Sequence, residues 1–480
     1  MNTVKLAGLE PKAVLGYFEE ICSMPHGSGN TKQISDYLVA FAKEHKLRYV
    51  QDELNNVIIF GDGTCGYEDH EPVILQGHMD MVCEKDADCT VDMDTEGVDV
   101  THDGEYIFAK GSTLGADNGI AIAYGLALLA DPTIPHPPLE VVCTVDEETG
   151  MYGAEGIDLS CLKGRRMLNI DSGSEGSIIV SCAGGARADV TLPVTRRPVY
   201  GPCVRLTVEG LEGGHSGSDI HMNRANANKV MGEFLRRVQE LMPICITKFK
   251  GGNKSNAIPR SCEVTLVALG MYIERINDIA AQLQAEIREQ YNEPYAIVRG
   301  DDVEALGGNA LTTECTANVI SLLNEIPFGV LEWVDEAKGQ VKTSMNMGIV
   351  NLEEDFQIVL SARSTVNKDK ADLMARMKEI VEAHNGQYNF AWECAAWEFK
   401  ENSPLQDTLK DVYQKMYGKL PNILTIHGIL ECGALCAKIP GLDCVSMGPN
   451  MYDLHTSRER LDIASTKRTW DYILEVLKTL

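Results

Sequence analysis

The sequence predicts an α/β protein in which a mixed sheet is covered by helices, with a second, α+β domain inserted into the first. Three observations lead to this fold class. Short apolar runs alternate with helix-like segments in the first third of the chain, half-polar strands follow in the middle, and the buried pattern returns after about residue 399. A chain of 480 residues is also too long for one ordinary hydrophobic core, so two domains are expected.

The first third predicts helices and central strands. Helices are expected over residues 11–22, where Pro11 suits a first turn, and over residues 31–45. Four later runs are too short for helices and too evenly apolar for strands with one exposed face, which is typical of strands covered on both sides. These runs are residues 56–60, 72–76, 139–145 and 167–170. Residues 118–130 are apolar almost throughout and predict a buried helix.

The pattern changes from about Arg187. The stretches ADVTLPV, CVRLTVEG and CEVTLVALG alternate apolar and polar residues, as in an antiparallel sheet with one solvated face. Two amphipathic helices are expected with them, over residues 225–242 and 273–291, and a strand-like run follows at 356–360. The C-terminal part predicts a helix at 405–417, a strand at 443–447 and a closing helix at 465–480. We therefore expect one domain over 1–186 and 397–480, with residues 187–396 inserted into it.

Composition excludes several partners. The formal net charge is −27, with 70 acidic and 43 basic residues, and such a surface repels nucleic acid and anionic lipid. The longest apolar run, residues 120–130, is shorter than the ~20 residues of a membrane-spanning helix, and residues 1–22 do not resemble a signal peptide. The 15 cysteines lack regular spacing and any CxxC pattern, which favours free thiols in a reducing compartment. We expect a cytoplasmic protein with no nucleic-acid or membrane partner.

Seven polar residues lie where strand-like runs end or where the buried helix begins. They are His78, Asp80, Asp117, Glu147, Glu148, Asp171 and His455. Taken singly, each has a common structural explanation, such as a helix N-cap for Asp117 or a solvated pair for the two glutamates. Ligands of α/β sheets bind at the carboxyl ends of the strands, however, and these residues are all expected at that edge. Together they predict a metal site.

The ligand types indicate which metal. Imidazole with carboxylate suits Zn²⁺, with Co²⁺ and Mn²⁺ as alternatives, whereas Ca²⁺ and Mg²⁺ prefer oxygen alone. One catalytic ion has about three protein ligands, and two histidines with three or more carboxylates are more than this number. A pair of ions that share one carboxylate accounts for the surplus.

The ordered motifs resemble a known family. GHMDMV at 77–82, GADNG at 115–119, TVDEETG at 144–150 and NIDSGSEG at 169–176, followed by His455, are similar in order and spacing to a metallopeptidase family. That family includes aminoacylase, glutamate-releasing carboxypeptidases and dimetal dipeptidases. GGHSG at 213–217, NAIPR at 256–260 and HGILECG at 427–433 further resemble its dipeptidase branch, and the likeness runs nearly end to end.

The resemblance implies a chemistry. Two Zn²⁺ ions per chain would hydrolyse dipeptides of the Xaa-His type through a hydroxide that bridges the ions, with Glu147 as the general base. Asp117 would bridge both ions, and Asp80 would hold the His78 ring. His78 and Asp171 would complete one ligand set, and Glu148 and His455 the other. Spacing alone does not decide which of Glu147 and Glu148 is the base.

The resemblance also assigns the inserted domain. It would be a lid and dimerisation domain of a homodimer that acts on short peptides. His215, in a glycine-rich segment, would help to hold the tetrahedral oxygen, often from the partner subunit. Arg363 would bind the terminal carboxylate of the substrate, a task that suits the guanidinium fork, and Asn256 would be a further substrate contact.

Other functions remain open at this point. An N-acyl amino acid deacylase, a carboxypeptidase or a tripeptidase on the same scaffold would need the same ligands, so only substrate contacts such as Arg363 and Glu431 could separate them. A non-catalytic metal-binding protein is an alternative from another class. Loss of Glu147 would be its signature, and Glu147 is present.

Overall fold

The computed structural model describes residues 5–268, 272–304 and 308–480. It divides into two compact units, each described separately below. Unit 1 comprises residues 1–181, 399–425 and 430–480, and unit 2 comprises residues 182–398 and 426–429. The short segment 426–429 packs with unit 2 although its flanking segments belong to unit 1.

Unit 1 contains the N-terminal and C-terminal parts of the chain. Its helices are α1 (Lys12–Cys22), α2 (Lys32–Glu44), α3 (Ala116–Ala130), α4 (Tyr152–Gly156), α9 (Pro404–Tyr417), α10 (Cys432–Lys438) and α11 (Ile463–Thr479). Its strands are β1 (Arg48–Gln51), β2 (Val57–Gly61), β3 (Val73–His78), β4 (Val100–His102), β5 (Tyr106–Ala109), β6 (Leu139–Thr144), β7 (Arg166–Asn169), β8 (Ser177–Cys182), β22 (Asn422–Ile426), β23 (Asp443–Ser446), β24 (Met451–Tyr452) and β25 (Arg460–Asp462).

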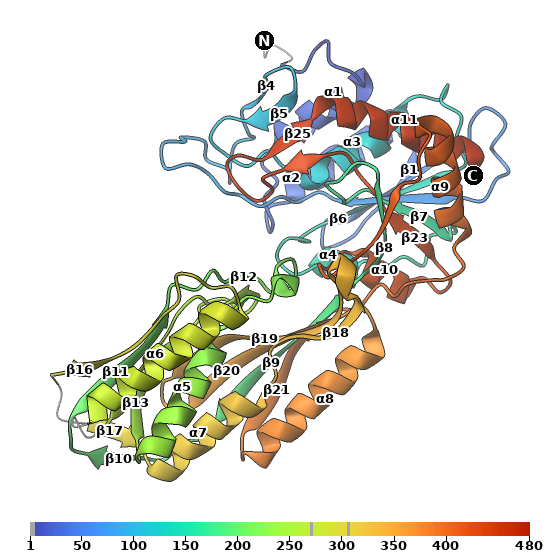
Figure 1. The fold of residues 1–480 in the computed structure, drawn as a ribbon. Coiled ribbons are helices and arrows are strands. Elements are labelled where there is room, and N and C mark those ends of the chain that lie inside the picture. Colours follow the sequence, from blue (N-terminus) through green and yellow to red (C-terminus); the bar gives the residue numbers. More distant parts are fainter. Residues whose placement is uncertain (1–4, 269–271, 305–307) are drawn as a thin grey trace. The chain divides into compact units, whose positions relative to one another are not determined.

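The main sheet of unit 1 is mixed and has eight strands in the order β1-β2-β6-β3-β7-β23-β8-β22. Every residue of β3, β6 and β23 is buried, because both faces are covered. On one side, α1, α2, α3, α9 and α11 pack with the sheet in one hydrophobic core, and α4 and α10 lie across the sheet from them (Figure 1). The predicted mixed sheet covered by helices is confirmed.

The four central strands are parallel, and their carboxyl ends lie level. In the register of the sheet, Gln76 of β3 pairs with Asn169 of β7, which pairs in turn with Ser446 of β23. On the other side of β3, His78 pairs with Thr144, the last residue of β6. The segments that follow these strands therefore emerge at one edge of the sheet.

A second, four-stranded sheet of unit 1 has the order β24-β25-β5-β4. Arg460 to Asp462 of β25 pair with Phe108 to Tyr106 of β5, far away in the sequence. This pairing fixes the C-terminal segment that carries His455, which lies between β24 and β25.

Unit 2 has a different character. Its helices are α5 (Ala227–Leu241), α6 (Ile273–Gln290), α7 (Thr313–Glu325) and α8 (Asn367–Ala383), with 3₁₀ turns η1 (Ile220–Met222) and η3 (Glu336–Lys338). Its strands are β9 (Gly184–Leu192), β10 (Arg196–Val199), β11 (Cys203–Glu209), β12 (Gly214–His215), β13 (Cys245–Gly251), β14 (Ala257–Ile258), β15 (Cys262–Val267), β16 (Ile297–Val303), β17 (Gly308–Leu311), β18 (Gly329–Asp335), β19 (Gln340–Leu352), β20 (Phe356–Ser364) and β21 (Gln387–Glu393).

The main sheet of unit 2 has nine strands, in the order β16-β11-β15-β13-β19-β20-β9-β21, with β18 also paired to β19. All of its strand pairs are antiparallel. Helices α5 to α8 lie along one face, where they share a core with the buried residues of the strands (Figure 1). Burial alternates along β20, as an antiparallel sheet with one solvated face requires. The expected α+β character of this part of the chain is confirmed.

Some boundaries differ from the predictions. The stretch CEVTLVALG forms β15 only to Val267, and its last residues, 269–270, lie outside the described residues. Strand β20 continues past residue 360 and includes Arg363, because it is paired on both sides, with β19 and with β9. Within the described residues, no helix is both long enough and apolar enough to span a membrane.

Candidate metal centre

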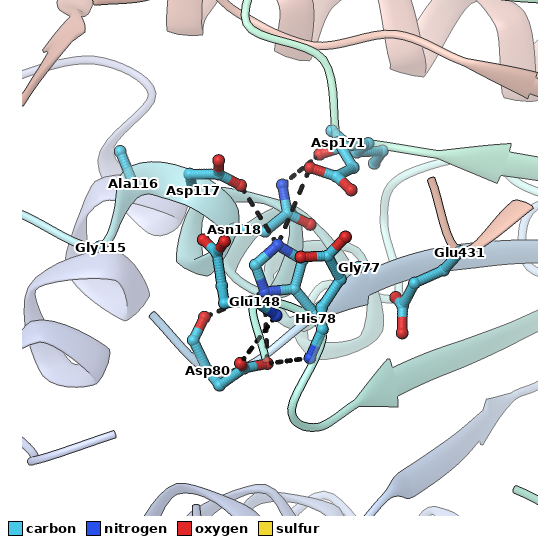
Figure 2. A network of polar contacts seen from close by, with 12 residues as sticks. Gly77, His78, Asp80, Gly115, Ala116, Asp117, Asn118, Glu148, Asp171 and Glu431 are labelled. Carbon is cyan, nitrogen blue, oxygen red and sulfur yellow. Dashed lines mark hydrogen bonds and ion pairs between the residues drawn. The ribbon is translucent and has the colours of Figure 1, made fainter. Parts of the chain in front are cut away.

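His78 is the last residue of β3, and its imidazole lies among carboxylates (Figure 2). Its side chain is only 1% exposed. Its Nε2 lies 3.2 Å from Asp117 Oδ1 and 3.8 Å from Asp171 Oδ1. On the other side of the ring, Nδ1 lies 3.0 Å from the backbone oxygen of Asp80 and 3.4 Å from its carboxylate. Nε2 is therefore the ring nitrogen directed at the carboxylate cluster.

Asp117 lies in the first turn of α3. The N-cap of this helix is Gly115, with φ of +76°, so Asp117 is not the N-cap that its position in the sequence suggested. The two carboxylate oxygens of Asp117 have different neighbours. Oδ1 lies 3.2 Å from His78 Nε2, and Oδ2 lies 3.5 Å from His455 Nε2. One carboxylate thus lies between two imidazoles.

Glu148 and His455 complete the cluster. Glu148 follows β6, and its Oε1 lies 2.9 Å from His455 Nε2. This Oε1 atom is buried. Although it is close enough to His455 for an ion pair, it accepts no hydrogen bond of ordinary geometry from the described part of the chain. Ligand atoms of His78, Asp117 and Glu148 all lie within 4.8 Å of one another. The structure thus brings together the five residues that the sequence proposed as metal ligands.

Asp80 connects the end of β3 with the loop after β6. Its carboxylate accepts hydrogen bonds from the Ser28 hydroxyl at 2.7 Å, the Glu147 amide at 3.1 Å and the Glu148 amide at 3.4 Å. It is 1% exposed. Asp80 therefore orients the backbone of the acidic pair as well as lying beside the His78 ring.

The crowding of charge changes the protonation of these groups. Burial, together with nearby carboxylates, raises the pKa of Asp171 and of Glu147 well above the usual range. Burial alone would lower the pKa of His78, but the Asp117 and Asp80 carboxylates raise it well above its ordinary value. The nearby carboxylates of Asp117 and Glu148 raise the pKa of His455 to about 10. Divalent cations bound here would offset the negative charge of the crowded carboxylates.

The donor set fits zinc-type ions. Ligand atoms about 2.1 Å from a tetrahedral ion lie roughly 3.4 Å from one another. The distances from the two imidazole Nε2 atoms to the surrounding carboxylates, 2.9–3.8 Å, agree with this spacing. Nitrogen and oxygen donors in this combination suit Zn²⁺, Co²⁺ or Mn²⁺.

Glu431 lies close to this cluster but is fully buried (Figure 2). Its Oε2 accepts hydrogen bonds from Gln76 Nε2 at 2.5 Å and from the Thr144 hydroxyl at 2.6 Å. Burial raises its pKa to about 7. The sequence predicts Glu431 only as a substrate contact, whereas in the structure its carboxylate binds side chains at the ends of β3 and β6.

In unit 2, His215 lies in the short strand β12, which pairs with β14. Its Nδ1 accepts hydrogen bonds from the amides of Gly217 and Ser218, both at 3.2 Å. Its own amide donates to the Asp219 carboxylate at 2.8 Å. Because Nδ1 is an acceptor, the neutral ring carries its proton on Nε2.

Asn256 and Arg363 also belong to unit 2. The backbone oxygen of Asn256 accepts a hydrogen bond from the Ser216 amide at 2.8 Å, which connects it to the segment of His215. Arg363 Nη1 lies 3.4 Å from the backbone oxygen of His427, and burial lowers the pKa of Arg363 to about 10. Among the residues that the structure describes, no carboxylate forms an ion pair with Arg363.

Imidazoles and carboxylates gathered at the carboxyl edge of a mixed sheet form a site that can hold metal ions, as in metal-dependent enzymes. Residues 74–479 match the model of peptidase family M20/M25/M40. The chain belongs to this family and is a hydrolase that acts on peptide bonds, which confirms the family that the motifs indicated.

Two relatives match nearly the whole chain. The cytosol non-specific dipeptidase of Escherichia coli K12 is 34% identical over 482 residues, which cover 99% of each chain. The crystal structure of aminoacylhistidine dipeptidase from Vibrio alginolyticus is 33% identical, has a TM-score of 0.90 and covers 99% of this chain and 98% of that one. Aminopeptidase PepT from Bacillus cereus, at 15% identity, a TM-score of 0.56 and 98% coverage of both chains, shares the fold.

Proposed function

We propose that this chain is a metallo-dipeptidase that uses two zinc-type ions. The observation that carries the two-ion proposal is Asp117, whose two carboxylate oxygens are directed at different imidazoles, those of His78 and His455. The dipeptide substrate is supported by the names of the two relatives that match this chain from end to end.

The ligands divide into two sets that share Asp117. His78 and Asp171 would hold one ion, and Glu148 and His455 the other. Zn²⁺ is the proposed metal, and Co²⁺ or Mn²⁺ fit the same donors. When bound, such ions supply Lewis-acid chemistry: they acidify water and polarise the carbonyl of the scissile amide.

Glu147 is the proposed general base. It would accept a proton from the attacking water and then deliver it to the leaving nitrogen, so that the amide C–N bond breaks without release of a free amide anion. Its backbone is held by Asp80, through the hydrogen bond from the Glu147 amide. Asp80 would also hold the imidazole of His78 through the Nδ1 side of the ring.

Unit 2 would supply substrate contacts. His215 would donate a hydrogen bond from Nε2–H to the oxygen of the tetrahedral intermediate, a role that its acceptor Nδ1 supports. Arg363 would bind the terminal carboxylate of the dipeptide, and its lack of a described carboxylate partner supports this. Asn256 would be a further contact. We place the enzyme in the cytoplasm, as the name of the Escherichia coli relative supports, and expect it to act as a homodimer.

A substrate panel tests the activity. The zinc-loaded enzyme would be assayed with dipeptides, including Xaa-His, and with tripeptides, N-acyl amino acids and longer peptides with a free C-terminus. The proposal expects the highest kcat/KM on dipeptides. A preference for N-acyl amino acids would indicate a deacylase, a preference for tripeptides a tripeptidase, and release of C-terminal residues from longer peptides a carboxypeptidase.

A further inference from the structure

A buried carboxylate that belongs to none of the proposed ligand sets binds the segment that carries Asp117. Glu459 is 3% exposed, and its two oxygens accept four backbone N–H groups. Oε2 lies 2.8 Å from the amide of Leu114 and 3.0 Å from that of Gly115. Oε1 lies 2.9 Å from the amide of Ala116 and 3.3 Å from that of Asp117.

The start of α3 requires such an acceptor. The first amides of a helix have no partner within the helix and attract negative charge. Here the turn is also irregular, because Gly115 has φ of +76° and Asp117 has non-helical backbone angles. A side chain at position 115 would meet Met81 Sδ at 2.8 Å, so Gly115 allows the turn to approach its neighbours closely. The Glu459 carboxylate satisfies four amides that the helix itself leaves unpaired.

Glu459 is itself fixed to the segment of His455. Its amide donates to the backbone oxygen of Thr456 at 3.1 Å, and the Thr456 hydroxyl donates to the backbone oxygen of Asp453 at 2.7 Å. The next residue, Arg460, begins β25. The side chain of Glu459 therefore connects two segments more than 340 residues apart, which carry Asp117 and His455.

We propose that Glu459 is a positioning residue for the dimetal centre, because it sets the distance between Asp117 and His455. This inference depends on the proposed function, in which these two residues bind the same ion. Their ligand atoms lie 3.5 Å apart, so a small shift of either segment would spoil a shared site. Residues that hold metal ligands in place typically contribute 10–100-fold to metal affinity.

A purely structural role is the alternative, and the chain contains a matched control. Glu140 of β6 is also 3% exposed, and its carboxylate accepts the amides of Lys163 at 2.8 Å and Gly164 at 2.9 Å. It lies near the amino end of its strand, away from the edge that carries the proposed ligands. Loss of Glu140 should cost stability without changing the geometry of the metal centre.

The experiment measures the zinc affinity of the full chain by competition with a chromophoric chelator, together with the thermal stability of the metal-free protein. In Glu459→Gln the amide NH₂ would oppose two of the four N–H donors. We expect zinc affinity to fall by about 10–100-fold. Glu459→Asp keeps both oxygens and should recover part of the affinity, and Glu140→Gln should bind zinc as the parent does.

The outcomes separate the possibilities. Parental zinc affinity in Glu459→Gln would overturn the inference, as would an equal loss of affinity in Glu140→Gln, which would indicate general destabilisation. If neither Glu459 variant folds, Glu459 is a support of unit 1 as a whole and the inference fails. If the parent chain itself binds fewer than two zinc ions, the proposed function fails instead, and this result does not depend on Glu459.

Discussion

Glu147 and Glu148 are adjacent and chemically alike, yet their surroundings differ. Glu148 Oε1 lies 2.9 Å from His455 Nε2 and belongs to the cluster of candidate ligand atoms. The carboxylate of Glu147 makes no such contact with the histidines in the described structure, while its amide is held by Asp80. At the scale of single residues, these differences support a ligand role for Glu148 and leave Glu147 available for proton transfer.

Substitution of the pair tests this assignment. Glu147→Gln should keep both ions but reduce kcat by about 10²–10⁴-fold, the usual contribution of a general acid–base group. Glu148→Gln removes a charged donor and should lower zinc content at a fixed free zinc concentration. Turnover and bound zinc would be measured on the same preparations. If Glu147→Gln lost metal and Glu148→Gln kept it, the roles would have to be exchanged.

At the scale of elements, the packing of α3 against β3 sets the distance between Asp117 and His78. Gly77 of β3 allows this contact, because a Cβ there would meet Asn118 Oδ1 at 2.4 Å and Ala121 Cβ at 2.5 Å. Gly77→Ala should therefore displace α3, lower the free energy of unfolding by about 1–3 kcal/mol and weaken zinc binding.

Gly16 of α1 provides the control for this substitution. A Cβ at position 16 would meet nothing within 4 Å, and the backbone there is helical. Gly16→Ala should stabilise the protein by about 0.4–1 kcal/mol and leave zinc affinity unchanged. Denaturant unfolding and zinc titration measure both effects. Unchanged zinc affinity in Gly77→Ala would show that the contact between α3 and β3 does not set the geometry of the site.

Some elements of the fold can be predicted from the sequence, and others depend on contacts that are distant in the sequence. Strands β3, β6 and β7 were predictable because burial on both faces leaves continuous apolar runs. The continuation of β20 through Arg363 was not, since its polar residues there are kept in the strand by neighbours on both sides. The irregular first turn of α3 is hydrogen-bonded to Glu459, which is too distant in the sequence to be found from any local pattern.

The same limit applies to the candidate site. The seven polar residues were found because they follow strand-like runs or open a helix, and the resemblance gave them roles. Nδ1 of His215 accepts hydrogen bonds, and the carboxylate of Glu431 is bound by buried side chains. Both facts depend on the geometry of the folded chain and cannot be read from residue types. The arrangement of a site at the edge of a sheet is thus more predictable than the groups that support it.

At the scale of the whole molecule, activity depends on a dimer if His215 acts in the site of the partner subunit. Chains carrying Glu147→Gln would be mixed with chains carrying His215→Ala, each inactive alone. If His215 crosses between subunits, one site of the mixed dimer holds both defects and the other holds none, so part of the activity should return. With subunit exchange confirmed, a mixture that stays inactive would show that His215 serves its own chain, and a monomer in solution would exclude the shared site.

The proposed function depends most on Asp117, whose carboxylate lies between His78 and His455 and would be shared by two ions. Elemental analysis of the zinc-reconstituted chain, after removal of free metal, tests it most directly. We expect about two zinc-type ions per chain and a marked loss of bound metal in Asp117→Asn, which keeps the shape of the side chain but removes its charge. One ion or none in the parent chain, or two ions retained in Asp117→Asn, would contradict it.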